Sequence, residues 1–179
     1  KWGSKAQKEK WLPILMDGEH LGALALTEPQ AGSDLLNGAQ TVANREGDEW
    51  VINGQKAWIT NVKYAPVVSV LLRTDKNGGS HGFSLILVET DRNGFIIHPP
   101  EKKMGIKGSV TNPLSFENVR IPKENLIGTD GRGFIYAMKT LDAGRLGLGA
   151  ACMGVSKELL ELSTKYAKER VQFDHPISH

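Results

Sequence analysis

The sequence has little cysteine: Cys152 is the only one among 179 residues. A single cysteine cannot form a disulfide within the chain, and it excludes a metal site built from a cysteine cluster. Its neighbours Ala150, Ala151 and Met153 predict a buried position on a helix, because a free cysteine usually packs as a small apolar side chain. A lone thiol also gives weak support to a reducing compartment.

Long apolar runs are absent as well. No stretch reaches the roughly 18 residues that a membrane-spanning helix needs, so we expect no transmembrane segment. The chain opens on Lys1-Trp2-Gly3, which is neither a signal peptide nor an initiator methionine, and we expect it to begin inside a longer protein. No carboxylate cluster accompanies the five histidines, so no metal site is expected. They are His20, His81, His98, His175 and His179.

Neither sign of charge predominates. The 22 basic and 20 acidic residues nearly balance and form no basic stripe, which argues against nucleic-acid binding. The sequence contains no G-x-S-x-G or Cys–His arrangement for acyl transfer, and no G-x-G-x-x-G follows a strand to bind NAD. Hydrophobic residues make up 40% of the chain, which is enough for a packed core.

The middle of the chain has the pattern of short β-strands. Turn sequences such as Glu46-Gly47-Asp48, Asn53-Gly54 and Asn77-Gly78-Gly79 separate segments rich in β-branched residues. Eight strands at this spacing predict a barrel or a sandwich. The segments are residues 21–26, 40–45, 49–53, 56–60, 67–72, 83–88, 94–98 and 114–121.

Both ends of the chain have helical patterns. Residues 5–16 are typical of the end of a helix that Pro13 interrupts and Asp17-Gly18 closes. No proline occurs from Gly133 to Val171, where apolar residues recur at helical spacing and predict a short helix followed by a long one. The order is therefore helix end, β-domain, helix start.

Five segments combine residue types that can bind a ligand. The first offers backbone N–H groups and hydroxyls, but a turn capped by Asp34 also explains it. In the second, alternation places Trp58 and Thr60 on one face of a strand. An aromatic ring beside a hydroxyl suits a flat cofactor with polar edges, but a core tryptophan next to a surface threonine also explains the segment. The segments are 26–34 (LTEPQAGSD), 58–61 (WITN), 103–111 (KMGIKGSVT), 141–145 (LDAGR) and 169–176 (ERVQFDHP).

The last three segments also leave two interpretations open. Residues 103–111 place glycines and hydroxyls between basic residues, and a solvated loop would have the same composition. Arg145 can bind a phosphate or pair with Asp142 three residues earlier. Arg170 can bind an anion or interact with the helix dipole at a C-terminus.

In this order and spacing, the five segments resemble the acyl-CoA dehydrogenase family. The signatures of that family look like ALTEPxAGSD, WITN, KMGIxxSxT, LDxGR and ERxQFGxP. Residues 7–13 (QKEKWLP) also look like the helix that precedes the family's barrel, so the resemblance covers essentially the whole chain. Three positions depart from the pattern. Asp174 and Gln30 stand where glycine is usual, and Gly108 replaces an alanine; the charge of Asp174 beside Arg170 would weaken a pyrophosphate contact.

The resemblance implies a mainly β fold. We expect the acyl-CoA dehydrogenase-like middle-domain β-barrel, flanked by the end of an N-terminal helix and the first helices of a C-terminal helical bundle. Residues 1–19 would end the N-terminal helical domain, residues 20–128 would form the middle β-barrel domain, and residues 129–179 would start a truncated C-terminal helical domain.

The resemblance also implies FAD as cofactor and assigns its contacts. The backbone around Leu26 and Thr27 would hold the polar edge of the flavin, Trp58 would pack against its ring system, and Thr60 would bond near N5. Arg170 and Phe173 would reach the FAD of a neighbouring subunit. The implied cofactor-binding residues are Leu24, Ala25, Leu26, Thr27, Gly32, Ser33, Trp58, Ile59, Thr60, Arg170, Gln172 and Phe173. Those implied to bind substrate are Ser33, Asp142 and Arg145.

The implied reaction is the α,β-dehydrogenation of an acyl-CoA thioester to a trans-2-enoyl-CoA. A carboxylate removes the α-proton while the β-hydrogen leaves as hydride to the flavin, and an electron-transfer flavoprotein takes the electrons. The family places that carboxylate either at the position of Gly144, which has no side chain, or in the C-terminal bundle. We therefore expect no catalytic residue within the chain and a base C-terminal to His179.

The resemblance further implies a homo-oligomer, dimer or tetramer, in the bacterial cytoplasm or the mitochondrial matrix. Two alternatives stay open. One is an acyl-CoA oxidase or a flavin monooxygenase of the same superfamily, since the barrel alone does not fix oxygen reactivity. The other is a non-catalytic module that binds flavin or CoA.

Overall fold

The computed structural model describes residues 1–179 and divides into two compact units, Lys1–Ala137 and Met138–His179. The helices are α1 (Lys5–Met16), α2 (Leu35–Gly38), α3 (Gly133–Glu169) and the 3-10 turns η1 (Val62–Tyr64), η2 (Gly79–Gly82) and η3 (Lys123–Asn125). The strands are β1 (Ala23–Ala25), β2 (Val42–Glu46), β3 (Glu49–Thr60), β4 (Val67–Arg73), β5 (Phe83–Glu89), β6 (Phe95–Ile97), β7 (Thr111–Pro122), β8 (Val171–Gln172) and β9 (His175–Pro176).

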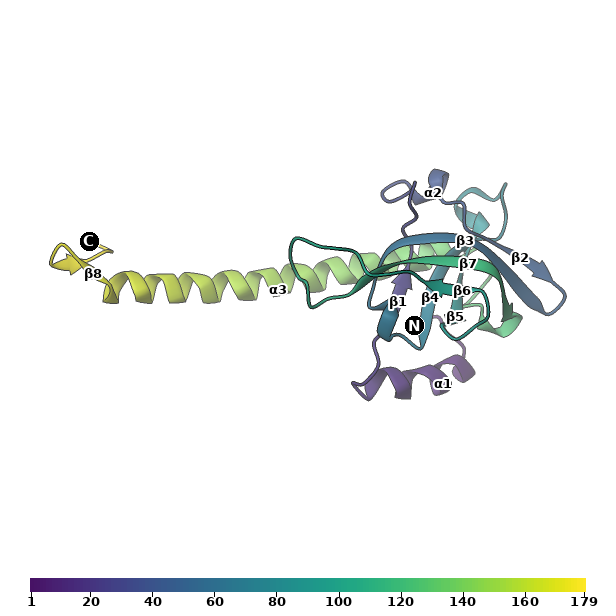
Figure 1. The fold of residues 1–179 in the computed structure, drawn as a ribbon, viewed down its shortest axis with the longest axis horizontal. Helices are drawn as coiled ribbons and strands as arrows, with labels where there is room; N and C mark the ends of the chain where they lie inside the picture. Colours follow the sequence, from purple (N-terminus) through teal and green to yellow (C-terminus); the bar gives the residue numbers. More distant parts are fainter. The chain divides into compact units, whose positions relative to one another are not determined.

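One seven-stranded sheet forms the body of the first unit (Figure 1). The strand order is β1-β4-β2-β3-β7-β6, with β5 paired to β4 outside this path. β4 runs parallel to β1 and β2, and the remaining pairs are antiparallel. The sheet curves into a half-barrel, which confirms the mainly β fold expected from the short, turn-separated segments.

The inner face of this half-barrel is the hydrophobic core. Val68, Val70 and Leu72 alternate along β4, and Ile86 and Val88 face them from β5. All five side chains are fully buried. Such burial contributes about 1.5–3 kcal/mol for each large aliphatic side chain, and this positions the strand ends that carry the site.

One predicted turn is wrong. Asn53-Gly54 does not separate two strands, because β3 runs unbroken for 12 residues with β2 on one side and β7 on the other. The register shifts here, since β7 carries an extra residue. The Asn53 amide bonds to the Asn118 side chain at 3.0 Å and to its backbone N–H at 2.9 Å. The Asn-Gly pair therefore marks a bulge in a long ladder rather than a hairpin.

The helix expected over residues 5–16 is confirmed as α1, which passes through Pro13 without ending there. Ser4 and Gln7 form a capping box at its start. The Gln7 side chain then donates to the carbonyls of Glu124 and Leu126 at 2.7 and 2.9 Å. A second link joins the Lys10 ammonium to the Glu89 carboxylate at 2.8 Å. Together these contacts hold α1 on the sheet.

Replacing Glu89 by glutamine is expected to lower the free energy of unfolding by about 1 to 2 kcal/mol at neutral pH. Burial raises the pKa of Glu89, but hydrogen bonds from Lys10 and Arg92 outweigh it and hold the pKa below 4.5. This stabilisation is therefore present above pH 4.5 and is lost as the pH falls through the folded pKa.

Denaturant titrations at neutral and acid pH, with hydrogen exchange across α1, measure the effect of Glu89→Gln. The difference from wild type should shrink in acid, and the α1 amides should exchange faster. Asp91→Asn is the control, because its exposed side chain makes none of the ion pairs of Glu89. An equal loss in both variants would contradict the role of Glu89.

The C-terminal helical pattern forms one helix, so the prediction of a short helix followed by a long one is wrong. α3 is continuous over 37 residues. Glycines such as Gly144 and Gly147 have open space around them and the helix contains no proline, so it continues through them. Cys152 is exposed on α3, and its predicted burial is wrong for this chain. None of the helices combines the length and apolar character that crossing a bilayer requires.

Candidate functional site

The site begins at a bulge in β3. Between Lys56 and Ile59, β3 advances three residues while β7 advances two, so one residue is extra. Trp58 lies in this bulge with a φ of 55°, a left-handed conformation that is rare for an aromatic residue. Such strain costs about 1–3 kcal/mol and is typical of functional sites. The bulge leaves the Trp58 side chain 56% exposed at the end of a buried strand.

The segment after β1 lies directly beside this bulge. The Ala57 N–H donates to the Thr27 carbonyl oxygen at 2.9 Å. Glu28 and Ala31 then exchange two backbone hydrogen bonds of 2.9 and 3.0 Å, which close a tight loop. Thr27 therefore lies beside Ala57, which precedes Trp58 in β3, although the two are far apart in the sequence.

Several donors at this place have no partner within the chain. The N–H and hydroxyl of Thr27 make no hydrogen bond, although the residue is half-buried. The N–H and hydroxyl of Ser33 and the hydroxyl of Thr60 are also free, and these two residues are exposed. Gly32 lies beside the Thr27 side chain: a Cβ atom built on Gly32 would be 4.0 Å from the Thr27 methyl carbon. Free donors beside an exposed aromatic ring suit a flat ligand with polar edges.

Other residues predicted around this place are buried. Ala25 and Ile59 are 0% and 2% exposed, and Leu26 also lies in the core. Leu24 is half-buried on β1, where it pairs with Ser69 of β4. Only the backbone of the three buried residues can therefore face a ligand, while their side chains anchor the strand ends.

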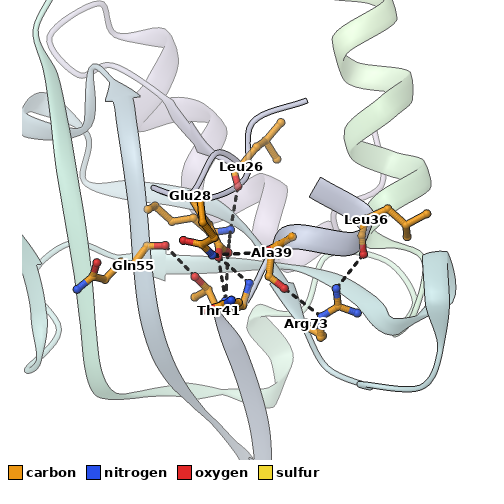
Figure 2. A network of polar contacts seen from close by, with 11 residues as sticks. Leu26, Glu28, Leu36, Ala39, Thr41, Gln55 and Arg73 are labelled. Carbon is orange, nitrogen blue, oxygen red and sulfur yellow. Dashed lines mark hydrogen bonds and ion pairs between the residues drawn. The ribbon is translucent and has the colours of Figure 1, made fainter. Parts of the chain in front are cut away.

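Glu28, which is labelled in Figure 2, forms a buried ion pair with Lys56. The Lys56 ammonium donates to the Glu28 carboxylate at 2.8 Å and to the Leu26 carbonyl oxygen at 2.9 Å. Glu28 also accepts the backbone N–H groups of Gln40 at 2.7 Å and Thr41 at 3.1 Å. The side chains of Lys56 and Glu28 are 1% and 2% exposed. The pair thus ties the segment after β1 to the strand that ends in Trp58.

Both partners of this pair have shifted pKa values. Burial raises the pKa of Glu28, but the charge of Lys56 and the N–H groups of Gln40 and Thr41 outweigh burial and hold it below its usual range. Burial lowers the pKa of Lys56, and Glu28 partly offsets this. A carboxylate with this many donors stays ionised, so we treat the pair as charged.

Sequence reasoning missed Lys56. The one signal available was a charged residue two positions before Trp58, in a segment expected to be a strand. Its partner Glu28 lies 28 residues earlier, and only the fold brings the two together.

Figure 2 also shows how Arg73 of β4 holds the chain that follows this loop. Its guanidinium donates to the carbonyls of Leu36 and Ala39 at 2.9 and 3.2 Å. The Thr41 hydroxyl donates to the Gln55 carbonyl at 2.8 Å. These bonds fix α2 and the start of β2 against β3 and β4, so the loop has a rigid base.

The other predicted segment of the first unit, residues 103–111, forms a loop. The Lys103 ammonium donates to the carbonyls of Ile106 and Ser109 at 2.9 and 2.6 Å. Met104 and Ile106 are 101% and 83% exposed. The loop is thus closed by its own lysine and presents apolar side chains to solvent.

The remaining predicted residues belong to the second unit and do not lie together. Asp142 and Arg145 form an exposed ion pair of 3.2 Å on α3. Arg170 follows the end of α3, which lies about 36 Å from Arg145 at the rise per residue of an α-helix. Beyond it, Phe173 and Asp174 form the turn between β8 and β9, both with positive φ. Such a turn favours glycine at its second position, where Asp174 stands.

Known proteins resemble this chain over nearly its whole length. The sequence model described as "Acyl-CoA dehydrogenase, middle domain" matches residues 23–119, and the one described as "Acyl-CoA dehydrogenase, C-terminal domain" matches residues 131–179. The short-chain specific acyl-CoA dehydrogenase of Rattus norvegicus mitochondria is 43% identical over 99% of this chain and 43% of its own length. The chain therefore spans less than half the length of this relative.

Solved structures agree with the sequence matches. The butyryl-CoA dehydrogenase of Megasphaera elsdenii superposes with a TM-score of 0.91 at 43% identity, covering 98% of this chain and 46% of the other. An acyl-CoA dehydrogenase of Bacillus anthracis, complexed with FAD, superposes with a TM-score of 0.89 at 46% identity, covering 99% and 31%. Since one model matches more than half of the chain, this protein belongs to the acyl-CoA dehydrogenase family.

Proposed function

We propose that this chain is the flavin-binding part of an FAD-dependent acyl-CoA dehydrogenase. The observation that carries the proposal is the exposed Trp58 ring, in a strained bulge beside the free N–H and hydroxyl of Thr27. An aromatic plane and fixed donors match the apolar ring and polar edge of a flavin. The similar enzyme of Bacillus anthracis is complexed with FAD.

The residues divide by what they contribute to FAD binding. Trp58 offers a stacking surface, while Thr27, Ser33 and Thr60 offer donors. Leu24, Ala25, Leu26 and Ile59 hold the two strand ends, and Gly32 lies in the loop beside the Thr27 methyl group. When bound, FAD supplies the two-electron acceptor that oxidation of a Cα–Cβ bond needs.

The substrate of the complete enzyme is an acyl-CoA thioester, and an electron-transfer flavoprotein receives the electrons. Ser33, Asp142 and Arg145 bind the substrate. Arg170, Gln172 and Phe173 contact the FAD of a second subunit in a homo-oligomer, which accounts for their distance from Arg145 along α3. Residues 20–128 form the middle domain, between helical domains that include residues 1–19 and 129–179. The enzyme works in the bacterial cytoplasm or the mitochondrial matrix.

The general base for α-proton removal lies outside residues 1–179. Glu28 is buried and bound by Lys56 and by backbone N–H groups, so its carboxylate cannot reach a substrate. Asp142 pairs with Arg145, and Gly144 has no side chain. A base needs a pKa raised toward neutrality, whereas the pKa of Glu28 is lowered.

Replacing Trp58 by alanine tests the proposal. Stacking of an aromatic side chain on a base-like ring contributes about 1–3 kcal/mol, so FAD affinity should fall roughly tenfold or more. Trp58→Phe should retain most of it. The measurement is a flavin fluorescence titration of the complete natural protein that contains these residues, freed of FAD beforehand.

The matched control is Trp11→Ala on α1, whose ring lies under the Lys10 ammonium at 4.5 Å. It should leave FAD affinity unchanged. Equal weakening by both substitutions, or none by Trp58→Ala, would contradict the placement of the flavin.

A further inference from the structure

Lys56 makes one hydrogen bond more than its ion pair requires. Its ammonium binds the Glu28 carboxylate at 2.8 Å, which already neutralises its charge. The second bond goes to the Leu26 carbonyl oxygen at 2.9 Å. That oxygen belongs to the peptide group whose nitrogen is Thr27, so the ammonium contacts the far end of the group that carries the Thr27 N–H.

The Thr27 N–H is a fixed donor without an acceptor in the chain. The Thr27 carbonyl is held by the Ala57 N–H at 2.9 Å, and the preceding carbonyl is held by Lys56. The peptide group that carries this N–H and the next peptide group are therefore both held, while the N–H itself is free in a half-buried residue. A donor left free at a half-buried position beside the exposed Trp58 ring is available to a ligand.

A charged donor on a carbonyl strengthens the N–H at the other end of the same peptide group. Hydrogen bonds in series polarise one another by roughly 10–30% per bond, and bonds to an ionised group are stronger than neutral ones. The Lys56 ammonium is desolvated at 1% exposure, so water does not weaken this effect.

We propose that Lys56 is a positioning residue that polarises the Thr27 N–H toward the electron-rich edge of bound FAD and thereby favours the reduced cofactor. The inference rests on the proposed function. A stronger donor binds reduced FAD more tightly than oxidised FAD, because reduction increases the electron density on the acceptor atoms.

Glu28 has a different task. Its carboxylate accepts the backbone N–H groups of Gln40 and Thr41 and the side-chain amide of Gln30 at 2.8 Å. It thus holds the loop and neutralises Lys56, but it makes no bond to the Leu26 carbonyl. Replacing Lys56 and replacing Glu28 should therefore affect the reduction of bound FAD differently.

The experiment compares Lys56→Met with Glu28→Gln in the complete natural protein loaded with FAD. Both variants lose the ion pair, but only Lys56→Met removes the bond to the Leu26 carbonyl. The ratio of affinities for reduced and oxidised FAD, measured as the midpoint potential by dye-coupled titration, should fall about two- to fourfold in Lys56→Met. Glu28→Gln keeps the lysine beside the Leu26 carbonyl but removes its countercharge, so this ratio should fall less than in Lys56→Met.

The possible outcomes separate the two ideas. Equal ratios in wild type and Lys56→Met, or the same fall in both variants, would overturn the role of Lys56 while FAD binding stands. A wild-type protein that does not bind FAD would overturn the proposed function, and this inference with it. Should Lys56→Met not fold, Lys56→Gln is measured in its place with the same expectation, since its shorter amide does not carry the charge.

Discussion

Replacing Lys56 by methionine is expected to lower the free energy of unfolding by about 3 to 5 kcal/mol. The methionine side chain is of similar size, so the core loses little packing. The cost arises because the Glu28 carboxylate, 2% exposed, is left without its countercharge, and the Leu26 carbonyl loses its donor. A buried group whose partner is removed keeps its full desolvation penalty.

The matched control for this change is Lys123→Met. Lys123 also donates to a carboxylate, that of Asp48 at 2.6 Å, but the two side chains are 48% and 81% exposed. Exposed ion pairs contribute about 0–1 kcal/mol, so this variant should unfold almost like the wild type. Urea titrations of both variants and the wild type provide the comparison. Similar losses in the two variants would show that burial does not decide the value of the pair.

The stability that the pair of Glu28 and Lys56 contributes should also depend on pH. The pKa of Glu28 in the folded state lies below its ordinary value of 4.5. Its contribution to stability is therefore fully present above pH 4.5 and is lost as the pH falls through the folded pKa. In Lys56→Met the lost countercharge lets Glu28 take up a proton more readily, so the gap between variant and wild type should narrow in acid.

Features that depend on local pattern could be predicted from the sequence. The β-branched segments gave most strands within a few residues, and residues 5–16 gave α1 to the residue. The loop 26–34 and Trp58 stood out because small, hydroxyl and aromatic residues mark places where backbone and ring face a ligand. The ion pair of Glu28 and Lys56 could not be predicted, since it depends on the long-range pairing that brings β3 under the loop.

Glycine was the main source of error. In α3, Gly144, Gly147 and Gly149 weaken helix propensity, and two helices were predicted where one continues. Glycine lowers the intrinsic helical preference by about 1 kcal/mol each, but a helix without proline tolerates that cost. At Asn53-Gly54 the sequence had the composition of a hairpin turn, yet the glycine lies inside β3.

Gly54→Ala is therefore expected to lower the free energy of unfolding by about 3 kcal/mol or more. Gly54 has a φ of 140°, which side chains rarely allow, and a methyl group there would meet the Cα of Thr41 at 2.7 Å. The N–H of Thr41 bonds to Glu28, and its hydroxyl donates to the Gln55 carbonyl. A side chain at residue 54 would push this strand away and loosen the base of the flavin loop.

Gly47→Ala separates the two causes of this loss. Gly47 also has a positive φ, of 62°, but nothing lies within 4 Å of its ideal Cβ position. It should therefore lose only the conformational part, about 1 to 2 kcal/mol. Denaturant titrations compare the two variants, and hydrogen exchange at Thr41 reports whether the network opens. If Gly54→Ala costs no more than Gly47→Ala, the close approach of Thr41 does not constrain the strand, and the rigid base inferred for the loop is wrong.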